Sequence, residues 1–194
     1  MAEDLGKAFM KMNKNPVVLT IDDEQAVRDT ICAYLEDYNY TVLAAENGQH
    51  GLDILKEYKV DLILVDLRMP ELDGLGVLSY TQKEMNETPV IVISGTGEIG
   101  DVVKALRLGA WDYLLKPIVD MTILLHAVEK CLERAQLLKI NRQNQSNLED
   151  QVNQKTRELT EINSRLKRVV ESTKKLLGCG KLDESADLLL QEFA

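Results

Sequence analysis

The chain has 194 residues, of which 45% are hydrophobic, and it carries a net charge of −9. Residues 1–135 hold 13 basic and 23 acidic side chains, and such an acidic body argues against extensive contact with nucleic acid, which requires a basic surface. No apolar stretch approaches the roughly 20 residues of a membrane span, and residues 1–15 lack the apolar core of a signal peptide. We therefore expect a cytoplasmic protein that binds neither nucleic acid nor a membrane and keeps its three isolated cysteines reduced.

Short apolar runs alternate with helical patterns through residue 135. The runs are residues 17–21, 41–45, 62–65, 90–93 and 113–115. The segments between them place apolar residues at helical spacing, and Asn47-Gly48 reads as a turn. Repeated strand–helix alternation predicts an α/β fold, a doubly wound five-stranded parallel sheet over residues 15–135 that follows a tail of residues 1–14.

Four of the predicted strands end on polar residues that can do chemistry. The first ends at Asp22 and Asp23, and the third ends at Asp66. Ser94 follows the fourth strand, and Lys116 follows the fifth. Ligands of open α/β sheets bind beyond the carboxyl ends of the strands, so these side chains are expected to meet in one crevice.

Three gathered carboxylates repel one another unless a cation compensates their charge, and Mg²⁺ with oxygen ligands suits such a site. A carboxylate oxygen of Asp66 could then attack a phosphoryl group, with Ser94 and Lys116 contacting its oxygens. Taken alone, Asp22 or Asp23 is explained more simply as the cap of the following helix. The ordered set favours phosphoryl transfer.

Residues 15–135 resemble the receiver domain of bacterial two-component response regulators. The matching segments, in chain order, are Ile21-Asp22-Asp23-Glu24, Val65-Asp66-Leu67-Arg68-Met69-Pro70, Asp73-Gly74, Val92-Ile93-Ser94-Gly95, Gly109-Ala110 and Asp112-Tyr113-Leu114-Leu115-Lys116-Pro117. The resemblance implies a flavodoxin-like sheet and phosphorylation of Asp66 by a sensor histidine kinase or phosphotransfer protein. It implies no enzyme activity beyond self-phosphorylation and autodephosphorylation at Asp66.

The same resemblance assigns the metal ligands and the switch. Asp23 would bind Mg²⁺ directly and Asp22 mainly through water, with Asp66 and the backbone carbonyl of Arg68 completing the set. Lys116 would pair with the phosphoryl group, Ser94 would move toward it, and Tyr113 would turn inward behind Ser94. The Lys116–Pro117 peptide bond is expected to be cis. Gly95 replaces a more usual alanine, and Arg68 and Thr96 occupy variable positions that flank the path of attacking water.

Residues 95–100 also fit the G-x-G-x-x-G fingerprint of dinucleotide-binding folds. That motif belongs after the first strand, with an acid at the end of the next strand. Here it follows the fourth strand and the next one ends in Lys116, so nucleotide binding is disfavoured.

Residues 136–177 form a heptad pattern without Gly or Pro, which predicts a coiled-coil helix. Its two seam positions are residues 138, 145, 152, 159, 166 and 173 and residues 141, 148, 155, 162, 169 and 176. The seam is polar at Asn141, Gln145 and Lys155 and apolar from Leu159 to Val169. We expect a parallel homodimer through residues 138–176; an amphipathic helix folded back on its own domain is the alternative.

Residues 178–194 follow two closely spaced glycines and read as a short amphipathic helix, the start of a missing output or sensor domain. One hypothesis is therefore a response regulator that relays its switch through the coiled coil. The other is the receiver part of a larger regulated enzyme, such as a GAF-linked kinase, a phosphatase or a cyclic-dinucleotide enzyme. A DNA-binding output is least favoured because no basic recognition helix is present.

Overall fold

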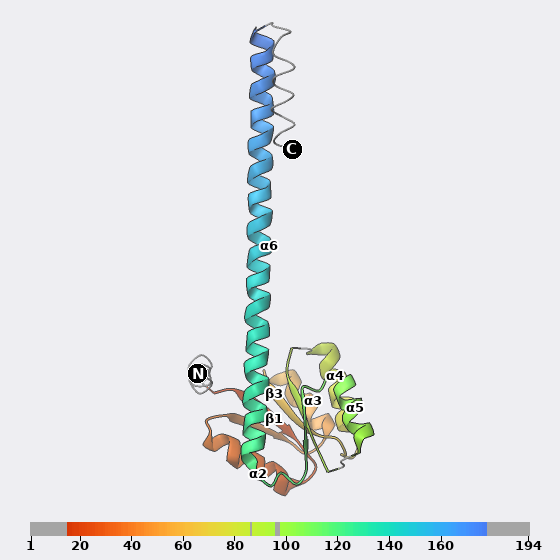
Figure 1. Ribbon diagram of the computed structural model, residues 1–194. Helices are drawn as coiled ribbons and strands as arrows, with labels where there is room; N and C mark the ends of the chain where they lie inside the picture. Colours follow the sequence, from red (N-terminus) through yellow and green to blue (C-terminus); the bar gives the residue numbers. More distant parts are fainter. Residues whose placement is uncertain (1–14, 86, 96–97, 178–194) are drawn as a thin grey trace. The chain divides into compact units, whose positions relative to one another are not determined.

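A computed structural model describes residues 15–85, 87–95 and 98–177 of the chain, which divides into a unit of residues 1–139 and a unit of residues 140–194. The first unit contains a five-stranded parallel sheet with the order β2-β1-β3-β4-β5 (Figure 1). Its strands are β1 (Val17–Ile21), β2 (Thr41–Ala45), β3 (Leu62–Asp66), β4 (Val90–Ser94) and β5 (Asp112–Leu115). The helices are α2 (Gln25–Asp37), α3 (Gly48–Glu57), α4 (Gly74–Glu84), α5 (Ile99–Arg107) and α6 (Met121–Leu177). The predicted doubly wound parallel sheet is confirmed.

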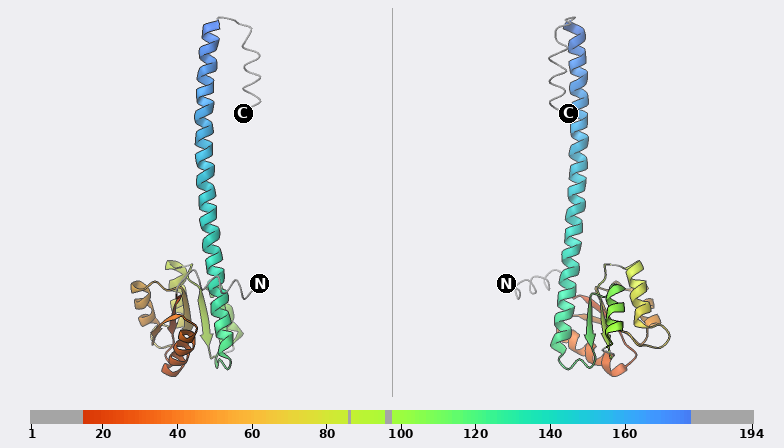
Figure 2. Two further views of the ribbon diagram at one scale, coloured as in Figure 1. Left: turned by 90° about the vertical axis from the view of Figure 1, so that its left-hand side faces the viewer. Right: turned by 45° about the vertical axis from the view of Figure 1, so that its right-hand side comes forward.

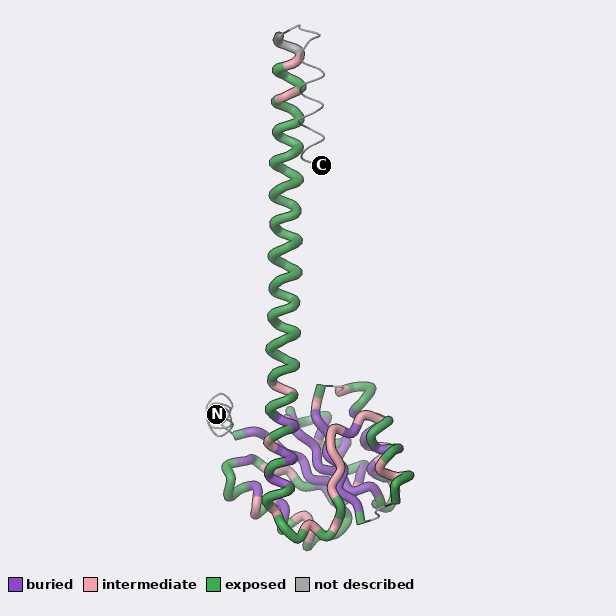
Figure 3. The backbone as a smooth tube through the Cα atoms, in the orientation of Figure 1, coloured by how far each residue is buried: buried purple, intermediate pink, exposed green. Residues whose placement is uncertain are grey.

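Helices cover both faces of the sheet (Figure 2). On one face α3, α4 and α5 pack against a core that includes Leu52, Leu78 and Ala105. On the other face α2 and the part of α6 before residue 140 enclose a second core around Leu35 and Val128. All five residues of β3 and of β4 are buried, as Figure 3 shows in purple, because a parallel sheet covered on both faces has no solvent-facing side.

The register of the strands determines where the predicted site residues lie. Ile21 of β1 pairs with Val65 of β3, so the residues that follow them, Asp22 and Asp66, lie next to each other. Asp66 itself pairs with Ile93, and Ser94 pairs with Leu115. The polar residues at the ends of β1, β3, β4 and β5 therefore lie along one edge of the sheet.

Two helices begin at side-chain caps. The Asn47 carboxamide oxygen accepts a hydrogen bond from the His50 amide at 2.8 Å, and an Asp73 carboxylate oxygen accepts one from the Gly76 amide at 2.8 Å. The interpretation of Asn47-Gly48 as a turn is corrected by this geometry. Gly48 is already the first residue of α3, because Asn47 satisfies one of the amides that a helix start leaves unpaired.

A single helix, α6, contains both the predicted fifth helix of the sheet and the predicted heptad segment. The seam side chains from residue 148 to residue 169 are exposed in the single chain; the apolar ones are Leu148, Val152, Leu159, Ile162, Leu166 and Val169, each at least 52% exposed. Figure 3 shows this stretch in green. A long helix is thus present as expected, and its pairing into a coiled coil stays a prediction. The predicted short helix of residues 178–194 and the tail of residues 1–14 lie outside the described residues.

None of the helices that the structure describes is long and apolar enough to cross a membrane.

Gly74, the first residue of α4, lies against the backbone of the residue that ends β3. A Cβ atom on Gly74 would come within 2.2 Å of the Asp66 carbonyl oxygen, whereas one on Gly100 in α5 would meet nothing within 4 Å. We expect Gly74→Ala to lower the free energy of unfolding by about 1–3 kcal/mol, since the backbone must shift to relieve the overlap. Gly100→Ala should leave it unchanged or raise it by up to about 1 kcal/mol.

Urea denaturation of both variants checks this prediction. Equal stabilities for the two variants would show that α4 does not pack tightly on the end of β3.

Candidate functional site

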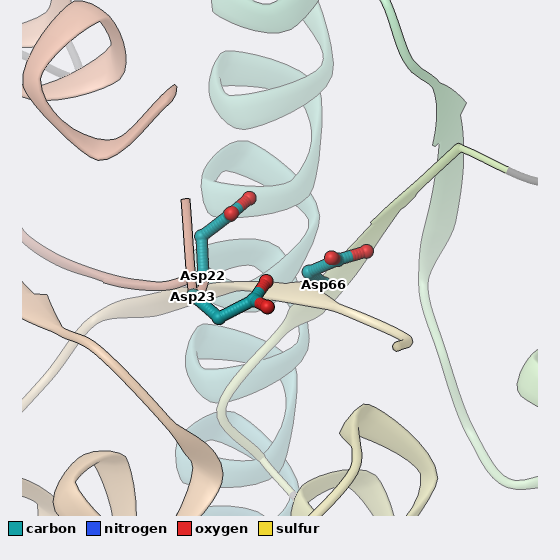
Figure 4. Close-up of side chains that lie close together, drawn as sticks. All are labelled: Asp22, Asp23 and Asp66. Atoms are coloured by element: carbon teal, nitrogen blue, oxygen red, sulfur yellow. The ribbon is translucent and has the colours of Figure 1, made fainter. Parts of the chain in front are cut away.

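Three carboxylates gather beyond the ends of β1 and β3 (Figure 4). One oxygen each from Asp22, Asp23 and Asp66 can be chosen so that all three lie within 4.8 Å of one another. Asp22 and Asp66 are buried, and Asp23 is exposed. The predicted acid cluster is therefore present, with two acids in the protein interior and one facing solvent.

Lys116 directly follows β5, which lies two strands from β3 in the sheet, and its side chain reaches three carboxylates. Its ammonium nitrogen lies 2.8 Å from an Asp22 carboxylate oxygen, 3.1 Å from Asp66 Oδ2 and 3.3 Å from a Glu24 carboxylate oxygen. The peptide bond between Lys116 and Pro117 is cis, as the resemblance implied. The Lys116 ammonium group thus forms ion pairs with three carboxylates.

Only one of the two carboxylate oxygens of Asp66 is paired among the residues that the structure describes. Asp66 Oδ2 is paired with Lys116, but Asp66 Oδ1 is buried and has no hydrogen-bond partner among the residues that the structure describes. A buried carboxylate oxygen without a partner raises the free energy of the folded state, because it has lost its hydrogen bonds to water and has no replacement in the protein. Mg²⁺ prefers oxygen ligands and is usually held by one or two carboxylates together with water and phosphate oxygens, so the residues present fit that ion.

Burial and ion pairing shift the pKa in opposite directions, both for Asp66 and for Lys116. Burial raises the pKa of the Asp66 carboxyl above its ordinary value, and the nearby Lys116 ammonium only partly offsets it; the Asp22 carboxylate raises it further. Burial lowers the pKa of Lys116, but its hydrogen bond and attraction to Asp22, together with those to Asp66, outweigh burial and raise it. Lys116 therefore stays charged, while Asp66 is easier to protonate than an exposed aspartate.

The other predicted site residues lie around this cluster. Ser94 is fully buried at the end of β4, on the strand next to Asp66. Tyr113 in β5 is half-buried and packs against the core beneath α3, α4 and α5. Arg68 follows β3 by two residues and is exposed, with a guanidinium nitrogen 3.4 Å from an Asp101 carboxylate oxygen.

The capping explanation for the first acid pair does not describe α2. That helix has Glu24 as its N-cap residue, without a side-chain hydrogen bond. Asp22 contributes locally in a different way, because its Oδ1 atom accepts a hydrogen bond from the Glu24 amide at 3.0 Å. This bond fixes the turn that leads from the strand into the helix.

Three contacts of the site were not predicted from the sequence. Glu24 shares Lys116, and the Arg28 guanidinium donates to the Asp22 backbone carbonyl at 2.6 Å. Asp101 in α5 pairs with Arg68. Glu24 directly follows the acid pair and Arg28 comes one helical turn later, so those two could have been suspected, but no pattern in the sequence pointed to Asp101.

The family model of the response regulator receiver domain matches residues 18–142 of the chain. Regulator of RpoS from Escherichia coli is 36% identical over 115 residues, which is 59% of this chain and 34% of that protein. A putative NtrX-like response regulator from Rickettsia conorii is 36% identical over 129 residues, 66% of this chain and 26% of that protein. The chain thus spans about a third or less of the curated relatives it matches.

Solved structures agree with this match. A response regulator receiver domain protein from Clostridium thermocellum is 32% identical, with a TM-score of 0.60, covering 63% of this chain and 98% of that one. NtrX from Brucella abortus, in complex with ADP, is 30% identical, with a TM-score of 0.63, covering 66% of this chain and 29% of that one. The sheet order, the acids and lysine at its edge and the family match agree, and the chain belongs to the response regulator receiver domain family.

Proposed function

We propose that Asp66 accepts a phosphoryl group from a sensor histidine kinase or phosphotransfer protein in a Mg²⁺-dependent step. The observation that carries this proposal is the state of its carboxylate: one oxygen is held by Lys116, and the other is buried beside two further acids without a partner among the described residues. Membership of the receiver family supports the same reaction. We place the protein in the cytoplasm, where such kinases present their phosphohistidine.

In this phosphoryl transfer the protein mainly positions the reacting groups and stabilises negative charge. An Asp66 oxygen attacks phosphorus, the new O–P bond forms as the donor's P–N bond breaks, and the imidazole leaves with the electron pair. Asp23, Asp66 and the Arg68 carbonyl would hold Mg²⁺ directly and Asp22 through water, and the ion would neutralise negative charge on the phosphoryl oxygens. Lys116 then exchanges its contact with Asp66 for one with a phosphoryl oxygen.

The switch would operate between two conformations that both exist beforehand. Ser94 moves toward the phosphoryl group, and Tyr113 turns inward behind it, which alters the surface made by α5, β5 and the first part of α6. To shift a 1:99 mixture to 99:1, these contacts must differ by about 5.5 kcal/mol between the two conformations. The phosphoryl oxygens, Ser94 and Lys116 are the groups that supply this difference.

The signal would leave through a parallel dimer formed by residues 138–176. The support is an exposed row of apolar side chains at heptad spacing along one uninterrupted helix. Such a row exposes more apolar surface than a monomeric helix usually shows, and a second copy would cover it. The polar residues Asn141, Gln145 and Lys155 would fix the register at some cost in stability.

A second function is that of the receiver part of a larger regulated enzyme, such as a GAF-linked kinase, a phosphatase or a cyclic-dinucleotide enzyme. The observation in its favour is that the curated relatives extend far beyond the part that this chain matches. In that case the proposed chemistry at Asp66 is unchanged, and the helix of residues 136–177 connects it to the regulated domain.

Incubation with acetyl phosphate and Mg²⁺ tests the acceptor assignment. Intact-mass spectrometry should show one phosphoryl group on the wild-type chain and on Asp53→Asn, and none on Asp66→Asn. Asp53 is a matched control because it is an exposed aspartate in α3 whose carboxylate contacts Lys56 and Gln49, away from the acid cluster. An undiminished adduct on Asp66→Asn would refute the assignment.

The raised pKa of Asp66 predicts how stability depends on pH. Well below the ordinary pKa of 3.8 the carboxyl is protonated in both states. As the pH rises the unfolded chain ionises first, so the fold loses stability until the folded pKa is passed. At pH 7 without Mg²⁺, Asp66→Asn should therefore raise Tm by a few degrees, and this gain should shrink toward pH 4. Mg²⁺ should raise the Tm of the wild type more than that of Asp66→Asn.

Thermal melts followed by circular dichroism provide this measurement. Asp53→Asn should show the opposite sign, because hydrogen bonds from Lys56 and Gln49 lower the pKa of Asp53. A lower Tm for Asp66→Asn at pH 7 would mean that its carboxylate is stabilised by its neighbours.

Light scattering on the full chain tests the dimer. We expect an elongated dimer at micromolar concentration, converted into a monomer by Ile162→Asp and retained in Ser164→Asp. Ile162 lies at a seam position and is 52% exposed in the single chain, while Ser164 lies on the outside of the heptad. An unchanged mass for Ile162→Asp, or a monomeric wild type, would contradict the coiled coil.

A further inference from the structure

Arg68 forms an ion pair that bridges two parts of the domain. Its guanidinium Nη2 lies 3.4 Å from Asp101 Oδ2, which joins the loop after β3 to the first turn of α5. The Arg68 side chain is 62% exposed, and that of Asp101 is 19% exposed. The contact is long and one of its partners is exposed, so this pair is weak enough to be exchanged for a better partner.

The side chain of Arg68 can also reach the phosphoryl acceptor. Arg68 follows Asp66 by two residues, and two residues of chain span at most about 7 Å between Cα atoms. Leu67 and Met69 are buried in the core beneath α3, α4 and α5, whereas the Arg68 side chain is 62% exposed and is not held by that core. An arginine side chain spans this distance.

We propose that Arg68 exchanges Asp101 for the phosphoryl group on Asp66 and thereby releases the first turn of α5. This inference rests on the proposed phosphorylation of Asp66. A phosphoryl group offers three oxygens and more negative charge than one carboxylate, and it matches the forked geometry of a guanidinium. Asp101 offers Arg68 a single long contact in the unphosphorylated protein.

Helix α5 is suited to respond to the loss of one contact. Among its nine residues only Ala105 is buried, whereas Ile99, Val103 and Leu106 are 80%, 40% and 49% exposed. The helix is therefore held to the core by little packing, and the loss of a contact at its first turn would loosen that turn. Arg68 would thus report the phosphoryl group to α5 separately from Ser94 and Tyr113.

Hydrogen–deuterium exchange of the full chain, with and without acetyl phosphate and Mg²⁺, tests the exchange of partners. Without phosphodonor, Arg68→Gln and Asp101→Asn should each speed exchange in the first turn of α5 by about two- to fivefold, the range expected for an exposed ion pair, and the double variant should add nothing. Phosphorylation should speed exchange there in the wild type and in Arg107→Gln, and leave Arg68→Gln unchanged. Arg107 is the matched control, since it is an exposed arginine in the last turn of the same helix.

The phosphoryl lifetime gives a second readout. Asp101→Asn should lengthen it, because Arg68 is then free to pair with the phosphoryl group, and Arg68→Gln should shorten it. Intact mass on the same samples shows whether the adduct is present. An adduct with the same rise in α5 exchange in Arg68→Gln as in the wild type overturns this inference alone, whereas absence of the adduct from the wild type overturns the proposed function with it.

Discussion

The site depends on the positive charge of Lys116, which lies among four carboxylates. Lys116 lies within 3.3 Å of carboxylate oxygens from Asp22, Asp66 and Glu24, and Asp23 adds a fourth acid nearby. Like charges in a buried site raise each other's free energy, and a single ammonium group cannot neutralise them all. We propose that a divalent cation relieves this excess of negative charge, and that an anionic group bound with it gives Lys116 a new partner.

The fold supplies this arrangement through strand register. Parallel pairing of β1 with β3, β3 with β4 and β4 with β5 brings residues as distant in the chain as Asp22 and Lys116 to one edge of the sheet. The central strands are buried on both faces and cannot slip by one residue without moving apolar side chains out of the cores. The same packing that stabilises the sheet thus fixes the distances among the acids and the lysine, while α5 has Ala105 as its one buried residue.

The strands and the cluster were predictable from the sequence because both follow from simple regularities. Apolar runs mark buried parallel strands, and strand ends mark the site, so the order of residues along the chain is enough to group Asp22, Asp23, Asp66 and Lys116. The pair of Arg68 with Asp101 could not be predicted, because it depends on loop paths and side-chain rotamers that no periodicity encodes. The sequence does not separate the helix cap at Asn47 from a turn, since caps and turns favour the same amino acids.

Burial raises the pKa of the Asp66 carboxyl, and we propose that a divalent cation stabilises its charged form. Carbon-13 NMR titration of the Asp66 carboxyl carbon in the full chain measures this directly. The pKa should lie above the ordinary aspartate value without Mg²⁺ and fall when Mg²⁺ is added, because the ion favours the charged form. A pKa at or below the ordinary value that does not respond to Mg²⁺ would contradict the claim.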